Sequence, residues 1–105
     1  MKEVTVQELK RMRDNNEVFQ LIDVREIHEA EQSQIGGLLI PMGEIMADVS
    51  KILKDKPVVI HCRSGARSAS VINALESQYG FTNLFNLKGG ILAWAKEIDP
   101  NIPSY

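Results

Sequence analysis

Cysteine is nearly absent from this sequence of 105 residues, which contains only Cys62. A single thiol forms no internal disulfide or CxxC redox pair, and it leaves no second thiol to resolve an oxidised Cys62. One cysteine and two widely separated histidines, His28 and His61, do not supply a compact set of zinc ligands. We therefore expect neither a disulfide scaffold nor a metal site, and a lone thiol is compatible with a reducing compartment.

An excess of positive charge and long apolar runs are also lacking. The sequence has 12 Lys and Arg against 14 Asp and Glu, a formal charge of −2 at pH 7, which argues against a general nucleic-acid binder. The N-terminal stretch MKEVTVQELKRMRDNNE is polar, unlike a signal peptide or a membrane span. We therefore expect a cytoplasmic protein that binds neither nucleic acid nor membranes.

The order of the sequence patterns predicts an α/β fold. The length suffices for one hydrophobic core, so residues 1–105 are expected to form a single domain. Thr5 and Glu8 form a capping-box pattern for a first helix, which Asn15 and Asn16 would end. Strand-like apolar runs occupy 18–24, 57–62 and 83–87, and amphipathic helical patterns occupy 43–57, about 66–79 and 88–98. This alternation predicts a mostly parallel sheet with helices on both faces.

The stretch HCRSGARSA, residues 61–69, places the thiol at the end of a predicted strand and just before a helix. A thiol in that position is near the positive end of the helix dipole and near unpaired backbone N–H groups. Arg63 and Arg67 add two cations nearby, and Gly65 allows the backbone to turn back so that the amides of residues 63–68 surround the sulfur. A core cysteine is the simpler alternative, but a core position has no use for two arginines and a glycine turn. We therefore expect a thiolate with a lowered pKa in an anion-binding loop.

The sequence CRSGARS resembles the active-site loop of rhodanese-like domains, which are thiosulfate and related sulfurtransferases. The segments LIDVRE (21–26), IGGLLIP (35–41) and LKGGILAW (87–94) are similar to further motifs of that family, in the same order, so the resemblance covers nearly the whole chain. It implies a rhodanese-like α/β fold and a persulfide carried by Cys62. It also implies that the substrate anion is bound by the loop that follows, made up of Arg63, Ser64, Gly65, Ala66, Arg67 and Ser68. The chain departs from the family pattern at Ser33–Gln34, where Gly-His is frequent, and at Ala30, where an aromatic residue is frequent.

The implied activity is that of a thiosulfate sulfurtransferase with a two-step exchange. A thiosulfate-like anion would donate a sulfane sulfur to Cys62, and cyanide, a thiol or a carrier protein would accept it. This chemistry requires no metal, cofactor or general base, and we expect none. Displacement at sulfur depends mainly on a lowered thiol pKa and a positioned anion.

Three other functions stay open. A phosphatase or an arsenate reductase is disfavoured, because the phosphate-handling loops of similar folds have one residue more between Cys and Arg than the four of RSGA here. A rhodanese-like binding module without turnover is also disfavoured, since such modules commonly lack the cysteine. A persulfide carrier that delivers sulfur to a protein partner would differ only in surface features that the sequence does not reveal.

For each polar residue near the predicted site, a functional role and a purely structural role are weighed. Asp23 and Arg25 end a strand at the same sheet edge as Cys62, and they either help to hold substrate or, as we favour, form a structural ion pair that pins the loop. His61 is expected on the opposite face of its strand as a packed, hydrogen-bonded side chain rather than a base. Ser64 and Ser68 either donate hydrogen bonds to the sulfur or only cap the following helix.

Overall fold

The computed structural model describes residues 1–103, and its centre is a five-stranded sheet in which every strand pair is parallel. The strands are β1 (Glu3–Val4), β2 (Gln20–Asp23), β3 (Leu38–Leu39), β4 (Val58–His61) and β5 (Leu84–Leu87), and their order across the sheet is β1-β5-β4-β2-β3. The central strand β4 is buried along its whole length, as its β-branched sequence VVIH predicts. Parallel strands bring their carboxyl ends to one edge, so β2 and β4 deliver Asp23 and His61 as register partners.

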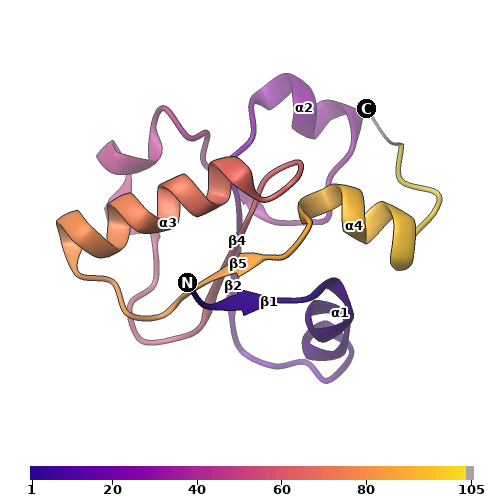
Figure 1. The fold of residues 1–105 in the computed structure, drawn as a ribbon, viewed down its shortest axis with the longest axis horizontal. Helices are drawn as coiled ribbons and strands as arrows, with labels where there is room; N and C mark the ends of the chain where they lie inside the picture. The colour runs from indigo at the N-terminus through magenta and orange to yellow at the C-terminus, as the bar shows by residue number, and fades with distance from the viewer. Residues whose placement is uncertain (104–105) are drawn as a thin grey trace.

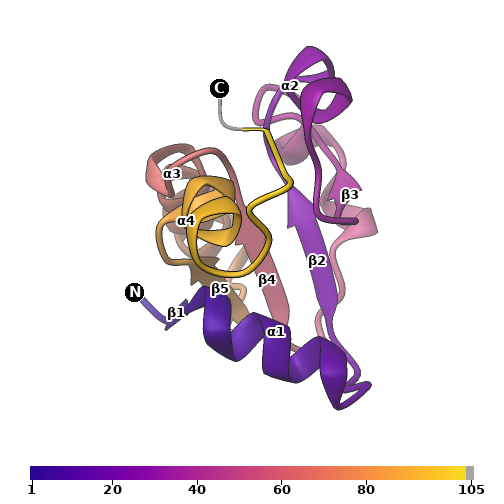
Figure 2. The same cartoon turned by 90° about the vertical axis from the view of Figure 1, so that its right-hand side faces the viewer.

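Helices cover both faces of this sheet, as the sequence predicts (Figures 1 and 2). On one face, α3 (Ala66–Tyr79) packs its buried residues Val71, Ile72 and Leu75 into a core cluster that also contains Ile60 and Cys62. On the other face, α1 (Val6–Asp14) and α4 (Gly90–Glu97) pack against each other and against a second cluster. The remaining α-helix, α2 (Ile27–Gln32), follows β2 at the carboxyl edge of the sheet.

The first helix begins as its sequence predicts. Thr5 is the N-cap of α1: its side chain accepts a hydrogen bond from the Glu8 backbone N–H, and the Glu8 carboxylate accepts one from the Thr5 backbone N–H. This reciprocal capping box fixes where the chain leaves β1 and enters α1. The strand β1 itself was not predicted, because a strand of two residues is too short to show alternation.

The amphipathic helix predicted over 43–57 is wrong. The structure has two short 3₁₀ helices instead, η1 (Ile45–Ala47) and η2 (Val49–Lys51), which meet at Asp48. Ile45 and Ile52 of the predicted apolar face are nevertheless buried in the cluster beneath α3, and Met46 and Val49 pack against it, but Leu53 is 40% exposed. Asp48, Val49 and Ser50 have low helix propensity, and tertiary packing of the isoleucines decides the local conformation.

The charged segment REIHEAEQSQ, whose sequence indicates a connection with some helical propensity, contains α2. The two-residue strand β3 was not predicted either, and the remaining elements agree with the sequence to within a few residues at their ends. No helix within residues 1–103 is long and apolar enough to cross a membrane.

Candidate active site

Cys62 is the first residue after β4, and its sulfur lies inside a loop of inward-facing hydrogen-bond donors. The backbone N–H of Gly65 donates to the Cys62 Sγ at 3.1 Å, and the backbone N–H of Ser68 donates at 3.4 Å. The Ser68 hydroxyl oxygen lies 3.4 Å from the same sulfur. The residue is only 1% exposed, but Ser64 and Ala66 on the rim of the loop are exposed. Cys62 therefore belongs to the core cluster beneath α3, but its sulfur faces the polar hydrogen-bond donors of the loop.

The loop takes this shape because its carbonyl groups bond outward to α4. The backbone N–H of Ile91 donates to the Cys62 carbonyl at 3.0 Å, and that of Leu92 donates to the Arg63 carbonyl at 3.1 Å. Gly90 makes this approach possible: it has a φ of +60°, and a Cβ at this position would lie 2.7 Å from the Cys62 carbonyl oxygen. Gly65, with a φ of +106°, then reverses the chain into α3. With the Cys62 and Arg63 carbonyls turned toward α4, amides that follow are free to face the sulfur.

The pKa of Cys62 is lowered by this surrounding. Burial acts against ionisation and raises the pKa, but hydrogen bonds from the Ser68 hydroxyl and from the backbone amides of Ser68, Gly65 and Ser64 together outweigh it. Each of these groups donates to a negative sulfur, which favours the thiolate over the thiol. Neither Ser64 nor Ser68 caps α3, whose N-cap is Gly65, so the capping alternative is wrong, and the Ser68 hydroxyl lies near the sulfur instead. Ser64 contributes through its backbone amide.

One of the two arginines of the loop, Arg67, is paired with an acidic residue. Its two terminal nitrogens donate to the two carboxylate oxygens of Glu29 at 2.7 and 2.8 Å. Glu29 is buried and comes from α2. Sequence reasoning missed Glu29, because it is one of several acidic residues in a polar segment and nothing local marks it as buried.

Asp23 and Arg25 form the buried ion pair that was favoured for them. The Arg25 Nη2 lies 2.8 Å from the Asp23 Oδ2, and its Nε also donates to the Asp23 carboxylate. The same guanidinium donates to the backbone carbonyls of Glu29 and Ser33, at 3.4 and 2.6 Å. Arg25 is fully buried. The pair therefore holds the Glu29 carbonyl within α2 and the carbonyl of its C-cap, Ser33, in the helix that presents Glu29 to Arg67.

His61 is packed behind the loop. Val59 belongs to the core cluster beneath α1 and α4, whereas Ile60 and Cys62 belong to the cluster beneath α3, so strand alternation places His61 on the face opposite Cys62. Its Nδ1 lies 3.3 Å from the Cys62 carbonyl oxygen, and its Nε2 lies 3.8 Å from the Asp23 carboxylate without a hydrogen-bond partner. The expectation of a fully hydrogen-bonded histidine is thus wrong for Nε2. Burial lowers the pKa of His61.

Asn86 is a second residue that the sequence reasoning missed. It lies in β5, is 5% exposed, and contacts the cysteine loop at Gly65 and Ser68. The Ser68 hydroxyl donates to the Asn86 Oδ1 at 2.6 Å, and the Asn86 Nδ2 donates to the Gly65 carbonyl at 3.1 Å. The available signal was a polar amide inside the apolar run LFNL, since a buried amide needs hydrogen-bond partners.

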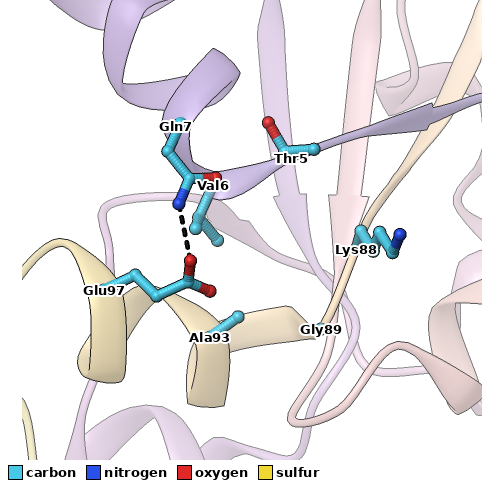
Figure 3. Close-up of a pocket in the computed structure, with 7 residues that line it drawn as sticks. All are labelled: Thr5, Val6, Gln7, Lys88, Gly89, Ala93 and Glu97. Atoms are coloured by element: carbon cyan, nitrogen blue, oxygen red, sulfur yellow. Dashed lines mark hydrogen bonds between the residues drawn. The ribbon is translucent and has the colours of Figure 1, made fainter.

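A separate pocket of about 360 Å³ lies between the start of α1 and α4 (Figure 3). Its lining residues are Thr5, Val6, Gln7, Lys88, Gly89, Ala93 and Glu97, and none of them belongs to the cysteine loop. Gln7 and Glu97 join the two helices through a hydrogen bond of 2.6 Å at its margin. The pocket therefore does not contribute to the surroundings of the sulfur.

Comparison with known proteins agrees with the resemblance seen in the sequence. A family model described as "Rhodanese-like domain" matches residues 5–97. A sulfurtransferase of Allochromatium vinosum is 43% identical over 88 residues, which are 83% of this chain and 80% of that protein. The crystal structure of a rhodanese-like domain protein from Staphylococcus aureus superposes with a TM-score of 0.83 at 33% identity, covering 93% of this chain and 95% of the other.

Longer proteins contain a similar segment. A chloroplastic rhodanese-like/PpiC domain-containing protein of Arabidopsis thaliana is 38% identical over 115 residues, a match that takes in 100% of this chain and 38% of that protein. The chain thus spans less than half the length of this relative.

Proposed function

Because the chain belongs to the rhodanese-like domain family, we propose that it is a sulfurtransferase that carries a sulfane sulfur on Cys62. The observation that carries this proposal is the pair of backbone amides, from Gly65 and Ser68, which donate to the Cys62 sulfur. Amides in fixed positions stabilise a thiolate before substrate arrives, and a thiolate is the form of cysteine that attacks sulfur. The relative from Allochromatium vinosum, which is named a sulfurtransferase, supports the same class of reaction.

The proposed donor is thiosulfate or a related sulfane-sulfur anion. The Cys62 thiolate attacks the outer sulfur of thiosulfate, a new S–S bond forms, and the bond to the sulfonate sulfur breaks so that sulfite leaves with the electron pair. The product is a Cys62 persulfide anion, so the total charge is the same before and after the step. The loop residues Arg63 to Ser68 would surround the incoming anion, and the amides that held the thiolate would face the persulfide.

The second step returns the thiolate. A nucleophilic acceptor such as cyanide or a thiol attacks the outer sulfur of the persulfide, and the Cys62 sulfur leaves as the thiolate that the amides stabilise. No proton has to be removed from Cys62 during either displacement if the thiolate is already present, so no general base is needed.

Thiosulfate loading tests this proposal. Incubation of the purified protein with thiosulfate is expected to add one sulfur atom to the intact mass and to release an equal amount of sulfite, because each transfer breaks one S–S bond. Intact-protein mass spectrometry and a sulfite assay measure the two products. Subsequent addition of cyanide should restore the original mass and yield thiocyanate.

The same samples separate the alternatives. An unchanged mass with thiosulfate and with a low-molecular-weight persulfide would contradict the sulfurtransferase proposal and would favour a binding module. Loading by the persulfide alone would replace thiosulfate by that class of donor. Hydrolysis of an aryl phosphate, assayed in parallel, would favour a phosphatase.

A further inference from the structure

The hydroxyl group of Ser68 lies within hydrogen-bond distance of more acceptor atoms than its single hydrogen can reach at one time. Its oxygen lies 3.4 Å from the Cys62 sulfur, 3.2 Å from the Gly65 carbonyl oxygen and 2.6 Å from the Asn86 Oδ1. A hydroxyl carries one hydrogen, so only one of these three acceptors receives it at a time. Which acceptor receives it decides whether Ser68 assists the thiolate.

The orientation of the Asn86 amide shows which acceptor receives the Ser68 hydrogen when Cys62 is a neutral thiol. Its Nδ2 donates to the Gly65 carbonyl at 3.1 Å, and the opposite orientation would bring two carbonyl oxygens together at that distance. The Oδ1 therefore faces Ser68, and two oxygen atoms 2.6 Å apart need a hydrogen between them. Ser68 is the group that supplies it, because an amide oxygen carries none.

We propose that Asn86 is a positioning residue for Cys62, which acts by competing with the sulfur for the single hydrogen of the Ser68 hydroxyl. In the thiol form, the hydroxyl donates to Asn86 and its oxygen accepts from the Cys62 S–H. In the thiolate form, the hydroxyl rotates to donate to the sulfur and the Asn86 oxygen loses its partner. The proposal rests on Cys62 being the reactive thiol of the proposed function.

The competition sets the reactivity of the sulfur in a predictable direction. Without Asn86, the Ser68 hydroxyl would give up only its 3.2 Å bond to the Gly65 carbonyl when it turns to the thiolate, whereas in the native protein it gives up the 2.6 Å bond to the Asn86 Oδ1. Removal of the Asn86 oxygen should therefore favour the thiolate further. The loop itself should keep its shape, because the Gly65 carbonyl also accepts from the backbone N–H of Ala69 at 3.1 Å.

Other charged groups around Cys62 are paired among themselves and stay the same in this comparison. Arg67 of α3 is bonded to Glu29 of α2, and behind the loop the Asp23 carboxylate is paired with Arg25, with the His61 Nε2 3.8 Å away. Arg63, the other charged residue of the loop, is also retained. A change measured on substitution of Asn86 is therefore assigned to the hydroxyl hydrogen rather than to a new charge.

The experiment measures the rate of Cys62 alkylation by iodoacetamide as a function of pH, which needs no sulfur transfer and so does not depend on the donor. Asn86→Ala is expected to lower the midpoint of the profile by about half a unit to one unit, as one neutral hydrogen bond is worth. In a Ser68→Ala background the same substitution should leave the midpoint unchanged, because no hydroxyl hydrogen remains to be redirected. Asn86→Leu makes the same chemical change with a side chain of similar size, should the alanine variant fold poorly.

Asn83→Ala is the matched control. Asn83 precedes β5, and its amide donates to the Leu53 and Lys56 carbonyls, away from the sulfur, so its loss should not move the midpoint. An Asn86 variant whose midpoint is unchanged or rises would overturn the proposal, since loss of a purely structural amide would loosen the cysteine loop and weaken the thiolate. A downward shift that persists without the Ser68 hydroxyl would overturn it as well.

Discussion

Cys62→Ser is expected to abolish sulfur transfer, with thiocyanate formation from thiosulfate and cyanide falling by at least about 1,000-fold. The hydroxyl of serine does not ionise near neutral pH, and oxygen does not form the S–S bond that the persulfide requires. The sequence contains no other thiol that could take over. The measurement is the initial rate of thiocyanate formation with wild-type and variant protein.

The fold should survive this change, which makes the loss of activity specific. Serine is close to cysteine in size, and the amides of Gly65 and Ser68 that now donate to the sulfur can donate to a hydroxyl oxygen. Thermal unfolding within a few degrees of the wild type is therefore expected. Activity retained by the variant would locate the chemistry at another group and contradict the proposed function.

Arg25→Met is expected to have the largest effect on stability, lowering the free energy of unfolding by about 3–5 kcal/mol. Methionine matches much of the volume of the arginine side chain but removes the guanidinium that faces Asp23 at 2.8 Å. The Asp23 carboxylate then stays buried without its cation, and the Glu29 and Ser33 carbonyls lose a donor. Urea unfolding followed by far-ultraviolet circular dichroism measures the difference.

Lys10→Met is the matched control for this prediction. Lys10 pairs with Asp14 at 2.7 Å in α1, but the two side chains are 51% and 59% exposed. Water screens an exposed pair, so the loss should be no more than about 0.5 kcal/mol. Equal, small losses for Arg25→Met and Lys10→Met would show that the buried pair does not hold the sheet edge and α2 together.

The part of the site that is built from consecutive residues could be predicted from the sequence. A strand end, a cysteine, a glycine with a positive φ and the first turn of a helix lie within the nine residues 61–69, so local backbone rules were enough to place amides around the sulfur. The alternation of β-branched runs and helical patterns likewise predicted the parallel sheet and its helical layers.

The parts that could not be predicted depend on contacts between distant segments. Glu29 and Arg67 are 38 residues apart, and Ser68 and Asn86 are 18 apart, so no local pattern joins them. The outward turn of the Cys62 carbonyl needs the N-terminus of α4, whose paired glycines were recognised as a motif but not as the contact surface for the loop. The same limit explains the 3₁₀ turns between β3 and β4, where burial of Ile45 and Ile52 outweighs a helical pattern.

The pH dependence of Cys62 alkylation in the folded and in the urea-unfolded protein tests the central claim most directly, because each sample contains the same single thiol. Alkylation follows the thiolate, whose pKa the amide and hydroxyl donors lower in the folded state. The half-maximal rate should therefore fall at a lower pH in the folded protein than in the unfolded chain, whose thiol has the ordinary pKa of about 8.5. A midpoint in the folded protein equal to or above that of the unfolded chain would contradict a thiolate held by the loop.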